Sequence, residues 1–265
     1  MMLRRILLAL VITALFSGAE FAKGGVSARG AQVDLTPGKF DYYALALSWQ
    51  PAFCEGHREK KECVSQTEER YDAKNLALHG LWPNKRGDRQ HKYAYCGVGK
   101  KTKNLDKPDS WCRMPKLKLT DETAENLPIY MPGYASCLQN HEWYKHGTCS
   151  GLKANDYFAA ACTIDSKIAD SSFGKFISNN IGNAVSSDSL LDEFEKDYGA
   201  GSRKFINLFC DRADGKALLS EVRIYLKKKL PGNGILNGSF ALPDKSERGN
   251  CPDSFIIDKA GFSEN

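Results

Sequence analysis

The stretch FDYYALALSWQ, residues 40–50, decides the fold class, because nearly all of its residues are aromatic or aliphatic. A continuous apolar run of this length, followed by Pro51, is typical of a buried strand. The stretch NLALHGLW, residues 75–82, has the same character and is also followed by a proline, Pro83. The sequence therefore predicts two buried strands in the first third of the chain.

The rest of the chain predicts helices first and strands last. Residues 84–116 are basic and rich in glycine, proline and lysine, which is typical of a long loop tied by disulfides. The predicted helices cover residues 120–127, a segment ending at Gly147, residues 155–170 with Asn155 as cap, and residues 187–198. A hairpin follows, made of RKFINLFC, the turn Ala213-Asp214-Gly215 and KALLSEVRIYL, and then a short strand within CPDSFIIDKAGF. Because no βαβ alternation is present, this order favours a single α+β domain with an antiparallel sheet.

The first residues are typical of a secretory signal peptide. A basic start, residues 1–5, precedes an apolar run, residues 6–16, and the small residues Ser17-Gly18-Ala19. We expect a signal peptide over 1–19, a flexible arm over 20–38 and a folded domain over 39–265. The apolar run is too short for a membrane span, and no later stretch is long enough. The sequence therefore predicts a soluble protein exported to the periplasm or the medium.

The nine cysteines agree with export. An odd number in an oxidising compartment indicates a disulfide framework and one free thiol. Cys162 is the expected free thiol, because it lies in an apolar helical stretch and resembles a small core residue. Lys and Arg exceed Asp and Glu by 37 − 32, which gives +5. That excess permits a polyanionic partner without requiring one.

The segment HEWYKHGTC, residues 141–149, resembles a zinc-protease motif but has a different spacing. His141 and His146 are five residues apart, which is about 140° on a helix, and Lys145 stands where the second metal ligand would be. This spacing argues against a metal site. Glu142, Lys145 and His146 instead share one helical face. An exposed helix with an ordinary Glu–Lys pair remains an equal alternative for the segment alone.

The segment LALHGLWP, residues 76–83, places His79 in an apolar strand. A single histidine there is more often a core residue, although Gly80 permits close approach of a ligand or another chain segment. Together with the first segment, it supplies two imidazoles, a lysine and a carboxylate. Such groups suit acid–base catalysis at a phosphate, and RNA carries its own nucleophile in the 2′-hydroxyl. Basic segments such as residues 100–103 could hold an RNA backbone, although each alone is more often a solvated surface.

The two segments together resemble the two active-site segments of the ribonuclease T2 family, in their letters, order and separation. The resemblance extends to FDYYALALSWQPAFC near the start and NCPDSFIIDKAGF near the end, so it covers nearly all of the predicted mature chain. It is strongest to the bacterial periplasmic branch, the ribonuclease I type. It implies an α+β fold whose antiparallel sheet is flanked by helices.

The resemblance also implies the role of each site residue. His79 would donate a proton to the leaving 5′-oxygen, and His146 would activate the 2′-hydroxyl. Glu142 and Lys145 would stabilise the transition state, and His141 would help to bind phosphate. The implied base-binding residues are Trp82, as a stacking surface, and Asn84. Some fungal members carry an aspartate at the latter position, so we expect low base specificity here.

The resemblance further implies the pairing of the cysteines. Three predicted bridges match the family and the fourth follows by elimination: Cys54–Cys63, Cys96–Cys149, Cys210–Cys251 and Cys112–Cys137. The expected activity is cleavage of single-stranded RNA through a 2′,3′-cyclic phosphate, by a monomer that needs no cofactor, metal or membrane. Two alternatives are a catalytically inactive homologue that binds RNA and a secreted metal-binding protein. Cleavage of RNA in excess EDTA would distinguish all three.

Overall fold

The structure, a computed structural model, describes residues 33–88, 90–232 and 238–262. The predicted signal peptide and most of the predicted arm lie outside this part of the chain. Within it the helices and strands follow one another in this order: β1 (Tyr42–Ser48), α1 (Gln50–Glu55), α2 (Lys61–Val64), η1 (Tyr71–Ala73), β2 (Ala77–Asn84), α3 (Lys100–Asn104), η2 (Pro108–Arg113), α4 (Asp121–Tyr130), η3 (Pro132–Ser136), α5 (Leu138–Lys145), η4 (Gly147–Cys149), α6 (Ala154–Asp170), α7 (Ser172–Asn179), β3 (Ala184–Ser186), α8 (Ser187–Tyr198), η5 (Ser202–Phe205), β4 (Ile206–Ala213), β5 (Lys216–Lys227) and β6 (Ser254–Ile256).

The strands form one sheet in the order β2-β1-β5-β6-β3, with β4 paired to β5. β1 lies between β2 and β5, which explains why its sequence is apolar on both faces. The α+β prediction is confirmed, and the predicted hairpin is the pair of β4 and β5. The sheet is not purely antiparallel as expected, because β5 and β6 run parallel.

The two prolines that follow the predicted strands do not act alike. β1 ends at Ser48, and Pro51 lies in the first turn of α1, where a missing N–H costs nothing. β2 does not end before Pro83, as we expected, but continues to Asn84. β2 is an edge strand with no neighbouring strand on one side. An edge strand tolerates a proline, because the N–H that proline lacks is not needed for pairing on that side.

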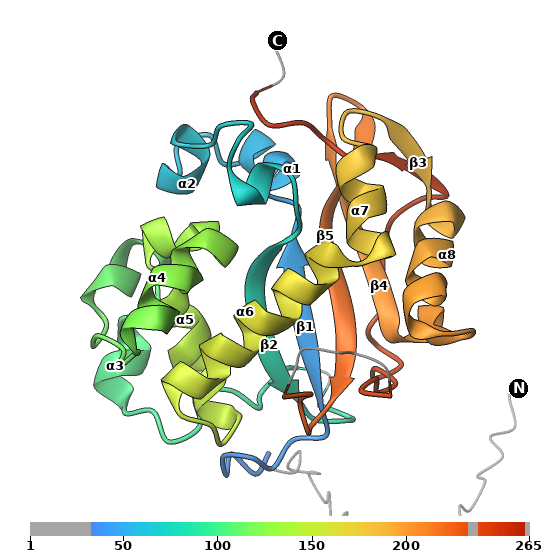
Figure 1. Ribbon diagram of the computed structural model, residues 1–265. Helices are drawn as coiled ribbons and strands as arrows, with labels where there is room; N and C mark the ends of the chain where they lie inside the picture. Colours follow the sequence, from blue (N-terminus) through green and yellow to red (C-terminus); the bar gives the residue numbers. More distant parts are fainter. Residues whose placement is uncertain (1–32, 89, 233–237, 263–265) are drawn as a thin grey trace, which may run out of the picture. The chain divides into compact units, whose positions relative to one another are not determined.

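The helices flank the sheet largely as predicted. α4 has Thr120 as its cap, and α8 has the predicted bounds. α6 crosses one face of the sheet (Figure 1), where the Tyr157 hydroxyl bonds to the backbone of Leu81 in β2. Asn155 does not cap α6, since its side chain accepts hydrogen bonds from Thr120 instead. The predicted loop 84–116 contains α3 and η2.

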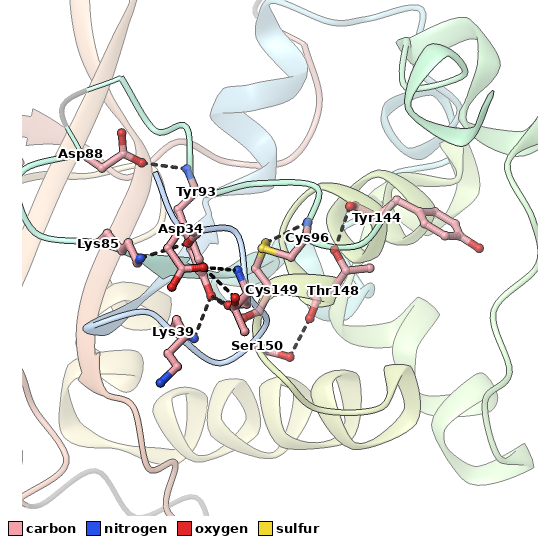
Figure 2. Close-up of a disulfide and its surroundings, with 12 residues drawn as sticks. Asp34, Lys39, Lys85, Asp88, Tyr93, Cys96, Tyr144, Thr148, Cys149 and Ser150 are labelled. Atoms are coloured by element: carbon pink, nitrogen blue, oxygen red, sulfur yellow. Dashed lines mark hydrogen bonds between the residues drawn. A yellow bond between two sulfur atoms is a disulfide. The ribbon is translucent and has the colours of Figure 1, made fainter. Parts of the chain in front are cut away.

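All four predicted disulfides are present, and Cys162 is free and buried. Figure 2 shows Cys96–Cys149 and the segment before β1 that lies against it. The amide of Gly38 donates to the carbonyl of Cys149, and the Tyr93 hydroxyl donates to Thr36. Residues 33–38 of the predicted arm are thus bonded to the domain. No helix in the described ranges has both the length and the apolar character needed to cross a membrane.

Candidate active site

A β-bulge in β2 positions the first predicted site residue. Leu78 and Gly80 pair with consecutive residues of β1, Leu47 and Ala46, so His79 is the extra residue between them. Side chains alternate between faces along a regular strand, which would place His79 opposite Gly80 and Trp82. The bulge turns it back towards their face. The rings of His79 and Trp82 therefore lie edge to face, with centroids 5.2 Å apart.

Glu142 of α5 lies at the centre of the site and has no exposed surface. Its Oε2 accepts a hydrogen bond of 2.7 Å from the Trp82 indole, and its Oε1 lies 3.7 Å from Nε2 of His79. A Cβ at Gly80 would lie 2.0 Å from that Oε2, so only glycine admits the carboxylate here. Burial raises the pKa of Glu142, against the opposing effects of His79, His141, Trp82 and Lys145.

The side chains of His141 and His146 lie close together at the end of α5. The helix ends at Lys145, and His146 is its C-cap, whose amide still donates to the carbonyl of Glu142. The ring centroids of His141 and His146 are 6.1 Å apart. The five-residue spacing therefore does not keep the two imidazoles away from a shared metal ion, as we expected it to. Among the described residues, only His141, Glu142 and His146 form a group that could hold a metal ion, with ligand atoms within 4.8 Å of one another.

Glu221 of β5 is a site residue that the sequence analysis missed. Its Oε2 lies 2.8 Å from Nδ1 of His79, and its Oε1 accepts a hydrogen bond of 2.6 Å from Arg223. Burial would raise the pKa of Glu221, but His79 and Arg223 outweigh it and lower that pKa. Since an ionised carboxylate only accepts, Nδ1 of His79 carries the proton. A carboxylate within an apolar strand was the signal in the sequence.

Two opposing effects act on the pKa of His79. Partial burial lowers it, but the hydrogen bond to Glu221 and the charges of Glu142 and Glu221 outweigh burial and raise it. His146 has the opposite balance. Burial, together with the positive charges of Lys145 and the neighbouring histidines, holds the pKa of His146 well below its ordinary value. The two environments therefore push the pKa values of His79 and His146 in opposite directions, towards a charged His79 and a neutral His146.

His141 is held by a second carboxylate that the sequence analysis missed. Nδ1 of His141 lies 2.5 Å from Asp106, which also accepts hydrogen bonds from Tyr95 and Trp111. These bonds outweigh burial and lower the pKa of Asp106, so His141 donates its Nδ1 proton. The sequence held little signal for Asp106, which lies in a polar loop between two short helices.

The predicted residues line one pocket of about 340 Å³, which we call the catalytic pocket. Its predicted lining residues are His79, Trp82, Asn84, His141, Glu142, Lys145 and His146, and its further lining residues are Ala44, His91, Arg223 and Glu247. The ring centroids of Trp82 and His146 are 5.3 Å apart, and the Arg223 guanidinium lies over the Trp82 ring. Asn84 donates to the carbonyl of Trp82. No carboxylate of a described residue pairs with Lys145, so its ammonium can meet an anion.

A second pocket of about 290 Å³ adjoins the first, and we call it the side pocket. His79 and Glu221 line its inner end, and Trp111, Phe53 and Leu138 give it apolar walls. His79 is therefore shared by both pockets. This arrangement can place a phosphate at the histidines and one group on each side of it.

The sequence matches the model of the Ribonuclease T2 family over residues 40–233. It is 35% identical over 241 residues to Ribonuclease I of Escherichia coli (strain K12), covering 85% of this chain and 88% of that protein. It is 32% identical to a ribonuclease of Aeromonas hydrophila, covering 62% of this chain and 58% of the relative.

The fold resembles solved structures at lower identity. Ribonuclease MC1 from the seeds of bitter gourd superposes with a TM-score of 0.52 at 20% identity, covering 82% of this chain and all of that one. RNase NT in complex with 5′-AMP superposes with a TM-score of 0.54 at 18% identity, covering 83% of this chain and 98% of that one.

Proposed function

Because this chain belongs to the ribonuclease T2 family and is an endoribonuclease, we propose that it cleaves single-stranded RNA by metal-free acid–base catalysis. The product of the first step is a 2′,3′-cyclic phosphate. The observation that carries this proposal is the opposed environment of two histidines that line one pocket. Neighbouring carboxylates raise the pKa of His79 and favour its charged form, whereas burial and nearby cations lower the pKa of His146 and favour its neutral form.

These environments assign the two proton transfers. Neutral His146 accepts the proton of the 2′-hydroxyl, and the resulting oxygen forms a bond to phosphorus. The bond from phosphorus to the 5′-oxygen breaks, and charged His79 gives that oxygen its Nε2 proton. Glu221 holds Nδ1 of His79, so only Nε2 faces the reacting atoms. Hydrolysis of the cyclic phosphate then uses the same two groups in reversed roles.

The remaining predicted residues act on charge. Lys145 can approach the phosphate oxygens, where negative charge grows in the transition state. Oε1 of Glu142 lies within 3.8 Å of Nε2 of both His79 and His141, and the charge of Glu142 raises the pKa of His79. Asp106 holds His141 through Nδ1, which leaves its Nε2 for a phosphate oxygen.

The two pockets give the RNA a direction. The leaving nucleotide must lie next to His79, which protonates its 5′-oxygen, so it occupies the side pocket. The nucleotide with the attacking hydroxyl then occupies the catalytic pocket beside Trp82 and His146. Stacking on aromatic rings tolerates every base, and Asn84 can both donate and accept. This agrees with low base specificity.

The disulfides support export. Four bridges persist in an oxidising compartment and are rare in the cytosol. We therefore expect the chain to act in the periplasm or the medium. We also expect it to act as a monomer. The predicted signal peptide is consistent with that place of action.

One experiment tests the reaction. Purified protein in excess EDTA should convert RNA to fragments with 2′,3′-cyclic phosphate ends and should leave single-stranded DNA intact. His79→Ala and His146→Ala should each lower kcat by at least about a hundredfold. Lys145→Ala and Glu142→Ala should cost less, and His141→Ala should raise KM more than it lowers kcat.

The same experiment separates the alternatives. Loss of activity in EDTA that zinc restores would favour a metal ion at His141, Glu142 and His146. RNA binding without cleavage would mark an inactive homologue. Cleavage of DNA at a comparable rate would contradict the 2′-hydroxyl mechanism.

A further inference from the structure

A groove of about 750 Å³ continues from the catalytic pocket, and Glu247 lines both. One wall is the turn after β2, at Arg86 and Gly87, and the other includes Lys204 and residues 242–248. Arg86 joins the two walls, because its guanidinium donates to the carbonyls of Leu242 and Pro243 and lies over the ring of Tyr42. The groove is therefore a formed surface feature next to the site.

The groove carries an excess of positive charge. Lys204, Lys245 and Arg248 are exposed, and no carboxylate of a described residue forms an ion pair with them. The two acidic residues of the groove are already engaged. Asp244 accepts hydrogen bonds from the amides of Gly87 and Ser246, and Glu247 faces Arg223 at 3.6 Å. Three cations are thus left for a polyanion.

The place of the groove indicates which part of a polyanion it meets. On the proposed function, on which this step rests, the leaving nucleotide lies in the side pocket and the attacking one lies beside Trp82. The side pocket and the catalytic pocket share His79, whereas the groove and the catalytic pocket share Glu247, which does not line the side pocket. A strand that leaves the catalytic pocket past Glu247 therefore runs in the 5′ direction.

We propose that this groove binds the phosphates of single-stranded RNA on the 5′ side of the scissile bond. Flexible exposed lysines and an arginine match a backbone of repeated phosphates and read no base. Such a site makes the enzyme prefer long strands with several nucleotides upstream of the cut. It adds affinity without adding base preference.

Three substrates with one cleavable bond test the direction. The minimal substrate is one ribonucleotide, of the base that the wild-type protein cleaves best, followed by deoxyadenosine. The second carries four deoxythymidines on its 5′ side, and the third carries four on its 3′ side. The test variant is Lys204→Ala/Lys245→Ala/Arg248→Ala. The control variant Lys153→Ala/Lys175→Ala/Lys259→Ala removes the same charge from exposed positions outside the groove.

We expect the test variant to lower kcat/KM for the 5′-extended substrate by at least about tenfold at low salt, and to change the minimal substrate by less than about twofold. The slope of log kcat/KM against log salt should become shallower by about 0.7 for each lost phosphate contact. The control variant should show neither change. An equal loss on all three substrates, a loss confined to the 3′-extended one, or no loss would each overturn the proposal.

A binding measurement separates this proposal from the proposed function. Fluorescence anisotropy with octadeoxythymidylate, which lacks the nucleophile, reports on the groove without any cleavage. The test variant should bind it at least about tenfold more weakly than the control variant. Equal affinities would overturn the groove even in an active enzyme. An inactive wild type with this affinity difference would contradict the mechanism and leave the groove standing.

Discussion

The division of labour that we propose for His79 and His146 rests on one carboxylate. Glu221 hydrogen-bonds Nδ1 of His79, whereas no carboxylate of a described residue hydrogen-bonds His146. Each imidazole has the same ordinary pKa, so the difference between them comes from these neighbours. Arg223 in turn holds Glu221 and lies over Trp82, which links the proposed acid, His79, to the proposed base-binding surface.

Glu221→Gln should shift the pH–rate profile in one direction. The general acid must be charged, so the alkaline limb of kcat/KM reports the pKa of His79. Glutamine keeps an acceptor for Nδ1 but removes the negative charge that raises this pKa. The alkaline limb should therefore move to lower pH, while the acidic limb, which we assign to His146, stays in place.

Exposed Glu122 in α4 provides the matched control, since Glu122→Gln removes the same charge from a residue that lines neither of the two pockets that contain His79. Its profile should match that of the wild type. A purely structural role for Glu221 would predict a uniform loss of rate with both limbs unmoved, and that result would contradict the assignment.

Gly80→Ala should uncouple Glu142 from the site. The new methyl group would lie 2.0 Å from the buried carboxylate and 2.4 Å from the Trp82 indole nitrogen. We expect kcat/KM on a dinucleotide to fall by about a hundredfold, as for a displacement of about 1 Å among reacting groups. Gly99→Ala is the control, because a Cβ added at Gly99 would contact no atom within 4 Å. It should leave the rate unchanged. A normal rate for Gly80→Ala would show that Glu142 is dispensable.

The elements that the sequence predicted well are those whose pattern is local. α8 has one apolar face and a serine cap, and the β4–β5 hairpin turns at Asp214-Gly215, both with positive φ. The bulge at His79 has no such local signal, because it depends on the pairing of β2 with β1. Glu221 and Asp106 were missed for a related reason. They lie 142 and 35 residues from the histidines they hold, and only the folded sheet and loops bring them together.

The length of the loop that each disulfide closes predicts how much it stabilises. Cys96–Cys149 spans 53 residues and Cys54–Cys63 spans 9. By loop-closure entropy, replacing both cysteines with alanine should cost about 4 kcal/mol for the first bridge and about 2.6 kcal/mol for the second. Urea unfolding of the two double variants measures this difference.

Activity separates the two bridges further. Cys149 lies three residues after His146, and its carbonyl accepts a hydrogen bond from the amide of Gly38. The Tyr93 hydroxyl lies 3.2 Å from the same carbonyl, and Figure 2 shows Tyr93 beside Cys149. Loss of Cys96–Cys149 should therefore lower kcat under conditions where the variant is still folded. Loss of Cys54–Cys63 should lower it less. The opposite order would show that η4 keeps its place without the bridge.

The domain as a unit carries an acidic group that its chemistry does not use. Asp165 of α6 is fully buried, and the backbone of Leu78 compensates only weakly for the burial of its carboxyl group. The Tyr71 hydroxyl is likewise buried without a partner. Burial raises the pKa of Asp165 well above its ordinary value, so the folded protein holds a proton there that the unfolded chain releases near pH 4.

This buried proton should make the folded protein more stable in acid. Between the unfolded and the folded pKa of Asp165, the folded state binds one proton more, and stability falls by about 1.4 kcal/mol for each unit of rising pH. The stabilising contribution is complete below the unfolded pKa and is lost as pH rises towards the folded one. Asp165→Asn has a similar shape and no proton to lose. Urea unfolding at several pH values should therefore show the variant gaining on the wild type as pH rises above about 4, the pKa of an aspartate in the unfolded chain. A constant difference across that range would mean that Asp165 is ionised in the folded protein.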